Sequence, residues 1–267
     1  MHGAEDLPPF LSEQRDEYIT AWQEGTCADA VLSIREGAET GSGVAFADGW
    51  QHRRIGDLYR AAYIREKQIL FVLEYRHPID NVTVYLKSRE DASVRSAVQF
   101  GALTALYEHC FGMHGVTLKF GDEIIILSAP SGTGKTTLSR LLEEYPDANV
   151  INGDFALLSL SEEGVMFEPS VFCGSSGISQ NIRVRVDRVV FLSQSPENYM
   201  TVLCGRQAVQ QFMNNCFTPV WDSVLFRAVE DHILNCIPRL KINSFGFAPD
   251  HHAAEVFTRA VNMKDKD

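Results

Sequence analysis

The sequence lacks an excess of basic residues. Its 24 lysines and arginines are outnumbered by 35 aspartates and glutamates, which gives 267 residues a formal net charge of −11 at pH 7. Such a charge disfavours binding to nucleic acid and to anionic membrane surfaces, so neither is expected as a partner. A ligand as negative as a nucleotide would need positive charge concentrated at one place in the chain.

Patterns for structural metal sites, membrane spans and export are absent as well. The six cysteines are scattered, with no Cys-x-x-Cys pair and no histidine cluster at zinc spacing, which favours reduced, mostly buried thiols. No apolar run approaches the roughly 20 residues that a membrane helix needs. The first residues, Met1–Asp6, contain no basic region followed by an apolar one. These absences predict a soluble, cytoplasmic protein with no membrane association.

What the sequence does contain is a strong motif at Ala129–Thr136, which reads Ala-Pro-Ser-Gly-Thr-Gly-Lys-Thr. It fits the pattern of phosphate-binding loops, except that alanine replaces the usual first glycine. The apolar run Glu123–Ser128 before it predicts a buried strand, and apolar residues at helical spacing after it predict a helix beginning near Lys135. The alternative, a glycine-serine turn with a chance lysine, is disfavoured because both flanks agree with the motif.

The chemistry of this loop predicts ATP and Mg²⁺ as cofactors. Glycines at 132 and 134 allow backbone N–H groups to turn toward an anion at the start of the helix. Lys135 can reach the β- and γ-phosphates, and the Thr136 hydroxyl can bind Mg²⁺. The predicted nucleotide-binding residues are Ser131, Gly132, Thr133, Gly134, Lys135, Thr136 and Thr137.

An acidic residue is expected to complete the metal site. The short apolar segment Asn149–Asp154 reads as a strand that ends in a carboxylate. A carboxylate at the end of a strand beside a phosphate loop is suited to position Mg²⁺. Thr136 and Asp154 are therefore the predicted metal ligands.

Apolar patterning divides the chain into three parts. Two β-branched runs over 68–75 and 82–87 predict a hairpin, and with it a β-rich N-terminal module over residues 1–92. Apolar residues around most of a helix circumference predict a buried connecting helix over 93–112. The third part is the ATP-binding domain, expected over residues 113–263.

Three stretches resemble the HPr kinase/phosphorylase branch of the phosphoenolpyruvate carboxykinase superfamily. Ser131–Thr137 is similar to its phosphate loop, and His114-Gly115, one predicted hairpin earlier, resembles the His-Gly that precedes that loop. Gly153-Asp154 resembles its paired aspartates. The resemblance spans roughly residues 110–261 and implies an α/β fold, a P-loop kinase domain with a mixed sheet. A small β-rich front module resembles HPr-kinase-like proteins of other pathways, including those that modify ribosomally made peptides.

The sequence also departs from that family. Gly153 stands where the family has its first aspartate, the base that the resemblance implies, and only Asp154 remains. The family's Glu-Ile-Arg-Gly-Leu-Gly signature would fall near Phe172–Ile178, where this chain has Cys-Gly-Ser-Ser-Gly. Phosphorylase activity and HPr as substrate are therefore not expected. Gly174–Gly177 is either an ordinary turn or a loop that touches phosphate or substrate.

The leading functional hypothesis is an ATP- and Mg²⁺-dependent kinase that phosphorylates a Ser or Thr hydroxyl of a peptide or protein, such as a ribosomal peptide precursor. Its predicted catalytic residues are His114, Lys135 and Asp154. His114 is either the base, because an imidazole titrates near neutrality, or a structural residue that fixes the hairpin. The alternatives are a kinase of a small hydroxyl metabolite such as free serine, and an ATP-binding regulatory module without catalysis. The sequence leaves open whether copies of the chain form a homo-oligomer.

Overall fold

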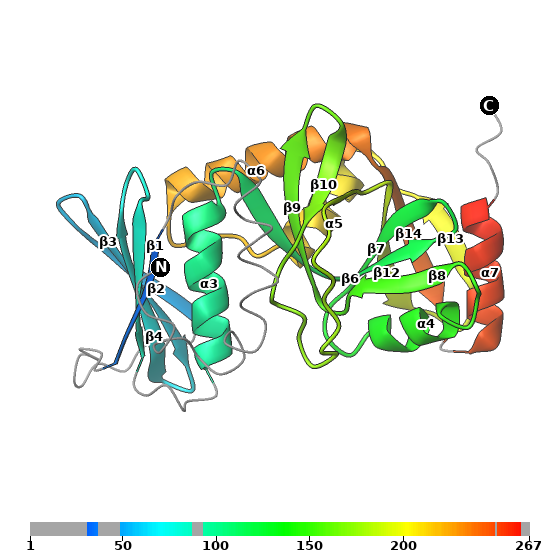
Figure 1. The fold of residues 1–267 in the computed structure, drawn as a ribbon, viewed down its shortest axis with the longest axis horizontal. Helices are drawn as coiled ribbons and strands as arrows, with labels where there is room; N and C mark the ends of the chain where they lie inside the picture. The colour runs from blue at the N-terminus through cyan, green and yellow to red at the C-terminus, as the bar shows by residue number, and fades with distance from the viewer. Residues whose placement is uncertain (1–30, 37–48, 87–92, 249, 263–267) are drawn as a thin grey trace. The chain divides into compact units, whose positions relative to one another are not determined.

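The computed structural model of the protein describes residues 31–36, 49–86, 93–248 and 250–262. The chain divides into two compact units (Figure 1). The first unit comprises the described residues up to Cys110 together with Thr218–Val229, and the second comprises Phe111–Phe217 and the described residues from Glu230 onward. Both combine helices and strands, so the chain is a mixed α/β protein.

The first unit contains a five-stranded sheet in the order β1-β5-β4-β3-β2. All neighbouring strands are antiparallel except β1 and β5, which are parallel. The predicted hairpin is present as the antiparallel pair β4 and β5. The strands are β1 (Val31–Glu36), β2 (Gly49–Ile55), β3 (Leu58–Arg65), β4 (Gln68–Arg76) and β5 (Asn81–Leu86).

The predicted connecting helix is α3 (Val94–Leu106), and it packs on the sheet of the first unit. At Gly101 the helix approaches β5 so closely that an added Cβ would lie 2.6 Å from Cγ2 of Val84. Because one face of α3 is buried against this sheet, the helix belongs to the core of the unit. The sequence-based boundary at residue 92 therefore falls inside the first unit.

Thr218–Val229 also belongs to the first unit, although the sequence places it in the ATP-binding domain. The Trp221 ring lies 3.8 Å, centroid to centroid, from that of Trp50 on β2. The Asp222 side chain is fully buried; it accepts a hydrogen bond from Tyr75 (2.8 Å) and contacts Nε2 of His77 (2.7 Å). Its other oxygen accepts the Val224 N–H (2.8 Å) at the start of α6 (Ser223–Cys236).

The second unit contains a nine-stranded mixed sheet. Its main path is β11-β10-β9-β6-β7-β12-β14-β13, with β8 paired to β6. The pairs β7–β12 and β12–β14 are parallel, whereas β6–β7, β6–β8, β9–β10 and β13–β14 are antiparallel. The strands are β6 (Cys110–Phe120), β7 (Glu123–Ser128), β8 (Ala148–Asn152), β9 (Phe155–Ser161), β10 (Gly164–Glu168), β11 (Val184–Arg185), β12 (Arg188–Gln194), β13 (Tyr199–Val202) and β14 (Lys241–Phe247).

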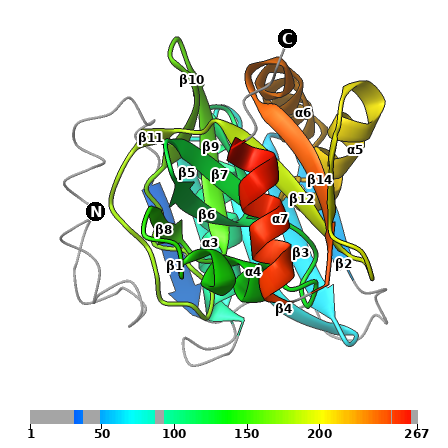
Figure 2. The ribbon, with the colours of Figure 1, turned by 90° about the vertical axis from the view of Figure 1, so that its right-hand side faces the viewer.

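Helices cover both faces of this sheet. On one face lie α4 (Lys135–Leu142) and α7 (His251–Asn262) (Figure 2). These helices share a buried apolar core with alternate residues of β6, β7, β12 and β14. On the other, Phe212 of α5 (Gly205–Asn215) packs against Phe191 of β12 at 5.4 Å. The start of α7 is capped by Asp250, whose Oδ1 accepts the Ala253 N–H at 2.9 Å.

Two predicted boundaries are wrong in a way that affects the site. The helix expected over 93–112 ends at Leu106, and β6 begins at Cys110, within the range expected to be helical. His114 therefore lies inside a strand, because the segment 110–115 pairs and packs as part of the sheet. None of the helices in the described part of the chain is long and apolar enough to cross a membrane.

Candidate functional site

The loop between β7 and α4 contains two glycines with left-handed backbone angles. Gly132 has φ +80°, and Gly134, immediately before α4, has φ +108°. The left-handed conformation favours glycine at 134, and an added Cβ there would also lie only 3.0 Å from Cζ of Phe247. The first N–H groups of α4 follow directly, and such groups have no partner within the helix and favour an anion.

The Lys135 side chain is buried against this loop. Its Nζ donates hydrogen bonds to the backbone oxygens of Ala129 (2.7 Å) and Pro130 (3.3 Å). Burial lowers the pKa of the Lys135 ammonium, and the nearby Asp154 carboxylate acts in the opposite direction. The ammonium group is thus held at the loop rather than extended into solvent.

Asp154 follows β8, and its turn is fixed by hydrogen bonds. Oδ1 of Asn152 accepts the N–H groups of Asp154 (3.1 Å) and Phe155 (2.9 Å). The backbone oxygen of Asp154 accepts the Gly115 N–H of β6 at 2.9 Å. The carboxylate Oδ1 then lies 3.5 Å from Nδ1 of His114.

His114 is placed by β6, beside the end of β7. Its backbone oxygen accepts a hydrogen bond from Oγ of Ser128 at 2.7 Å. Burial lowers the pKa of the His114 imidazole, Lys135 lowers it further, and Asp154 opposes them, so the pKa falls below its ordinary value. A half-buried, neutral imidazole next to a carboxylate can accept a proton at physiological pH.

A cavity of about 480 Å³ opens beside these groups. It is lined by His114, Asp154, Ala129, Pro130, Ser131, Asn214, Asn215, Cys216 and Phe217. Cys216 forms a β-bridge with Met113, and Phe217 N–H bonds the Gly112 oxygen at 2.8 Å, which attaches the end of α5 to β6. Sequence reasoning missed residues 214–217 because a helix end that lines a cavity carries no motif.

Residues 173–178 form a second glycine-serine loop, which lies against the end of β8. The Gly153 N–H bonds the Ile178 oxygen at 3.1 Å, and Nδ2 of Asn152 bonds the Phe172 oxygen at 3.1 Å. The sequence left the role of this loop open between a turn and a functional contact. The structure brings Gly174 of this loop so close to Asp154 that an added Cβ would lie 2.5 Å from Oδ2 of the carboxylate.

The remaining predicted residues lie around the loop. Ser131 lines the cavity, and the Thr133 hydroxyl bonds the Pro130 oxygen at 2.9 Å. Thr136 and Thr137 are exposed in the first turn of α4. The structure thus places His114, Lys135 and Asp154 close together, with the predicted phosphate-binding residues beside them.

The donor set is compatible with Mg²⁺ but is not a complete protein cage. Among the described residues no three His, Cys, Asp or Glu side chains converge in a way that could hold a metal ion. Mg²⁺ commonly takes one or two carboxylates and completes its shell with water and phosphate oxygens. Asp154 and the Thr136 hydroxyl offer oxygen ligands of that kind.

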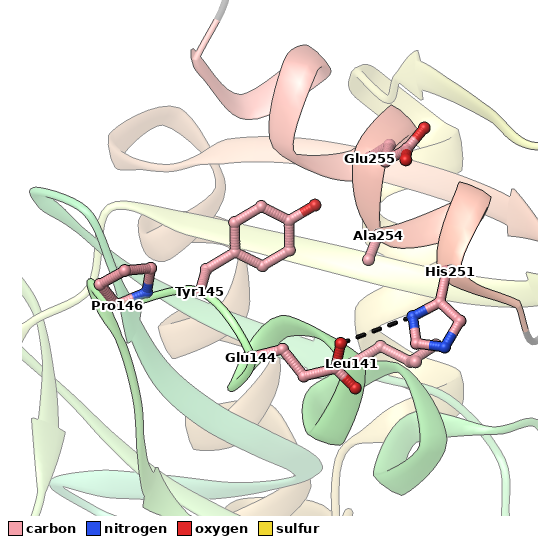
Figure 3. A pocket seen from close by; sticks show the side chains of 7 residues that line it. All are labelled: Leu141, Glu144, Tyr145, Pro146, His251, Ala254 and Glu255. Atoms are coloured by element: carbon pink, nitrogen blue, oxygen red, sulfur yellow. Dashed lines mark ion pairs between the residues drawn. The ribbon is translucent and has the colours of Figure 1, made fainter.

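A second, smaller cavity of about 290 Å³ lies away from these residues (Figure 3). It is lined by Leu141, Glu144, Tyr145, Pro146, His251, Ala254 and Glu255, at the end of α4 and the start of α7. His251 contacts Glu144 at 3.5 Å and is largely exposed. None of the predicted site residues lines this cavity.

The chain matches no protein-family model and no curated protein sequence. Among solved structures it is similar to the HPr(Ser) kinase/phosphatase from Coxiella burnetii, with a TM-score of 0.33 and 12% sequence identity. That similarity covers 56% of this chain and 93% of the other. A TM-score this low assigns no activity, so function has to be argued from the residues of this chain.

Proposed function

We propose that this protein is an ATP- and Mg²⁺-dependent kinase that transfers the γ-phosphoryl group to a Ser or Thr hydroxyl of a peptide or protein. The observation that supports it is the proximity of the loop lysine Lys135 to a half-buried histidine and a carboxylate, His114 and Asp154, which line one cavity. Phosphoryl transfer requires mainly positioning and neutralisation of charge, and these groups are suited to supply both.

The nucleotide is assigned to the Ala129–Thr137 segment. The left-handed glycines free backbone N–H groups for the phosphates, and the start of α4 adds the positive end of a helix dipole. Lys135 would exchange its carbonyl contacts for phosphate oxygens. Thr136 and Asp154 would hold Mg²⁺, which when bound supplies charge neutralisation at the phosphates.

The acceptor hydroxyl is assigned to the cavity beside His114. In the proposed step the acceptor O–H bond breaks and its proton moves to the imidazole. The hydroxyl oxygen forms a bond to the γ-phosphorus, and the bond from that phosphorus to the β–γ bridging oxygen breaks, leaving ADP. The lowered pKa of His114 keeps the ring neutral and able to accept the proton.

Two alternatives have some support in the same site. The cavity volume of about 480 Å³ also suits a small hydroxyl metabolite such as free serine. A non-catalytic nucleotide-binding module is favoured by the glycine at 153, where no side chain can act as the base.

The decisive variant is Lys135→Ala, compared with Lys119→Ala, which removes an exposed lysine of β6. Losing a charged hydrogen-bond donor costs about 1.5–3 kcal/mol, so Mg-ATP affinity measured by calorimetry should fall by at least tenfold in Lys135→Ala alone. Single-turnover transfer from γ-labelled ATP to candidate peptides, proteins and small hydroxyl compounds then identifies the acceptor class. Equal Mg-ATP affinity in both variants would refute the nucleotide site. Binding without transfer to any acceptor would favour the non-catalytic module.

A further inference from the structure

The end of β8 and the second glycine-serine loop fit one another without space for another atom. An ideal Cβ on Gly153 would lie 2.0 Å from Oγ of Ser176 and 2.4 Å from its Cβ. An ideal Cβ on Gly174 would lie 2.5 Å from Oδ2 of Asp154 and 2.6 Å from both Cβ and Cγ of that residue. Non-bonded Cβ atoms do not tolerate such distances, so side chains at 153 or 174 would displace their neighbours.

Internal hydrogen bonds hold the loop in this conformation. Oγ of Ser176 donates to the Cys173 oxygen at 2.6 Å and accepts the Ile178 N–H at 3.2 Å. Gly153 N–H bonds the Ile178 oxygen, which connects the loop to the turn before Asp154. The loop is therefore a fixed wall on the side of the Asp154 carboxylate that carries Oδ2, while Oδ1 faces His114.

We propose that the loop Cys173–Ile178 positions the Asp154 carboxylate toward His114, and that Gly174 is the positioning residue through which it acts. This inference rests on the proposed function only in giving Asp154 a catalytic role. The contact itself is a property of the fold. Ser176 has a related role, because it fills the space that a side chain at 153 would need, and an aspartate there would have to displace it.

The loop offers a matched control. Gly174 and Gly177 have nearly equal angles, φ +60° and φ +67°, so alanine introduces similar backbone strain at both. A Cβ on Gly177, however, meets no atom within 4 Å. A difference between Gly174→Ala and Gly177→Ala therefore reports the contact with Asp154 and not the left-handed conformation.

The first measurement is the single-turnover rate of phosphoryl transfer together with the KM for ATP. Misplacing a reacting group by about 1 Å can cost about 10²-fold, so Gly174→Ala should lower the rate by that order while KM changes by less than threefold. Gly177→Ala should stay within about threefold of the wild type in both, since it leaves Asp154 in place. Equal rates for the two alanine variants would overturn the proposal.

The second measurement needs no enzymatic activity. In an Asp154→Gly background the atoms that clash with residue 174 are gone, so Gly174→Ala should lower the urea midpoint no more than Gly177→Ala does. In the protein that keeps Asp154, Gly174→Ala should lower the urea midpoint clearly more than Gly177→Ala does. Absence of this coupling would overturn the positioning contact. Coupling in a protein that neither binds Mg-ATP nor transfers phosphate would refute the proposed function and retain the contact.

If the Gly174→Ala protein fails to fold, a third pair of variants tests the same loop. Ser176→Ala removes the hydroxyl that fixes the loop, and Ser195→Ala removes a hydroxyl that similarly accepts the Glu197 N–H at 3.1 Å elsewhere in the same unit. Ser176→Ala should lower the transfer rate about tenfold, a fraction of the 10²-fold above, and Ser195→Ala should not. Equal effects would count against the loop as a positioning element.

Discussion

At the scale of single residues, the candidate site depends on the charges around His114. Burial and Lys135 both disfavour the imidazolium, whereas Asp154, 3.5 Å away, favours it. Burial and Lys135 together outweigh Asp154, so the pKa of His114 falls below the ordinary histidine value. Without an acid at residue 153, the neutral imidazole of His114 is the group that we propose as the base for the acceptor proton at pH 7.

The first prediction at this scale concerns pH. If His114 is the base, kcat depends on its neutral form and is lost as pH falls through the lowered pKa of the folded protein. His114→Gln should flatten this acid limb and reduce kcat by roughly 10²–10⁴, the usual size of general-base catalysis, with Mg-ATP affinity nearly unchanged. Single-turnover rates across pH for both proteins provide the measurement.

His252→Gln is a suitable control because this histidine is exposed on α7. An acid limb that persists in His114→Gln would make His114 structural and transfer the role of base to Asp154.

Residues of the site differ in how far the sequence predicted them. Lys135 and its glycines form a local motif with a fixed spacing, so the sequence alone could predict them as a candidate phosphate-binding loop. The contact between Ser176 and Gly153 could not be assigned in this way, because it joins residues of two different loops and has no periodicity. From the sequence, Gly153 is interpreted as the position of a lost aspartate. In the structure, Ser176 fills the space that a side chain at 153 would occupy.

At the scale of elements, a buried polar network fixes the ends of three strands in the second unit. The Arg188 side chain of β12 is almost fully buried and donates to Glu123 of β7 (2.7 Å) and to Asn243 of β14 (2.7 Å). Lys241 adds a contact to Glu123 at 2.9 Å. Burial alone raises the pKa of the Glu123 carboxyl, but hydrogen bonds from Arg188 and Lys241 outweigh it and hold the pKa below its ordinary value.

The prediction for this network is a pH-dependent stability. Glu123→Gln leaves a buried guanidinium without its counter-charge and should lower the free energy of unfolding by about 3 kcal/mol at pH 7. Because the folded-state pKa of Glu123 is lowered, its contribution is complete above the ordinary glutamate pKa and is lost as pH falls through the lowered value. The difference between the two proteins in urea unfolding should therefore shrink below about pH 4.

Glu163→Gln, at an exposed turn between β9 and β10, should leave unfolding within about 0.5 kcal/mol of the wild type at every pH. A Glu123→Gln effect that stays constant down to acid pH would show that the ion pair is not its cause.

Element types were more predictable than element ends. Strand β7 has a continuous apolar β-branched run, and its bounds agree with the strand that the sequence predicts over Glu123–Ser128. The start of β6 was missed because Cys110–Gly115 mixes glycine, histidine and methionine, which have weak strand preference. Its strand conformation comes from pairing and burial within the sheet, which are tertiary contacts.

At the scale of the whole molecule, the chain crosses between its two units more than once. Thr218–Val229 belongs to the first unit, far in sequence from the strands that it packs against. Periodicity reports which face of an element is apolar, not which distant element covers it. For this reason the sequence predicted three consecutive parts, over residues 1–92, 93–112 and 113–263, and did not predict the return of the chain at Thr218–Val229.

The last prediction tests this return. Trp221 is buried and contacts Trp50 and Phe100, and its Nε1 donates to the Tyr75 hydroxyl at 3.1 Å, all within the first unit. Removing a buried tryptophan costs about 3–5 kcal/mol, so Trp221→Ala should speed hydrogen exchange in the first-unit strands by about two orders of magnitude or more. The neighbouring variant Val220→Ala, at a side chain that is 60% exposed, controls for position in the chain. Hydrogen-exchange mass spectrometry resolves the strands of both units.

If Trp221→Ala left exchange in β2, β3 and β4 unchanged, residues 218–229 would not be part of the core of the first unit. Because the contacts of Trp221 lie in that unit, exchange in β7, β12 and β14 should change far less.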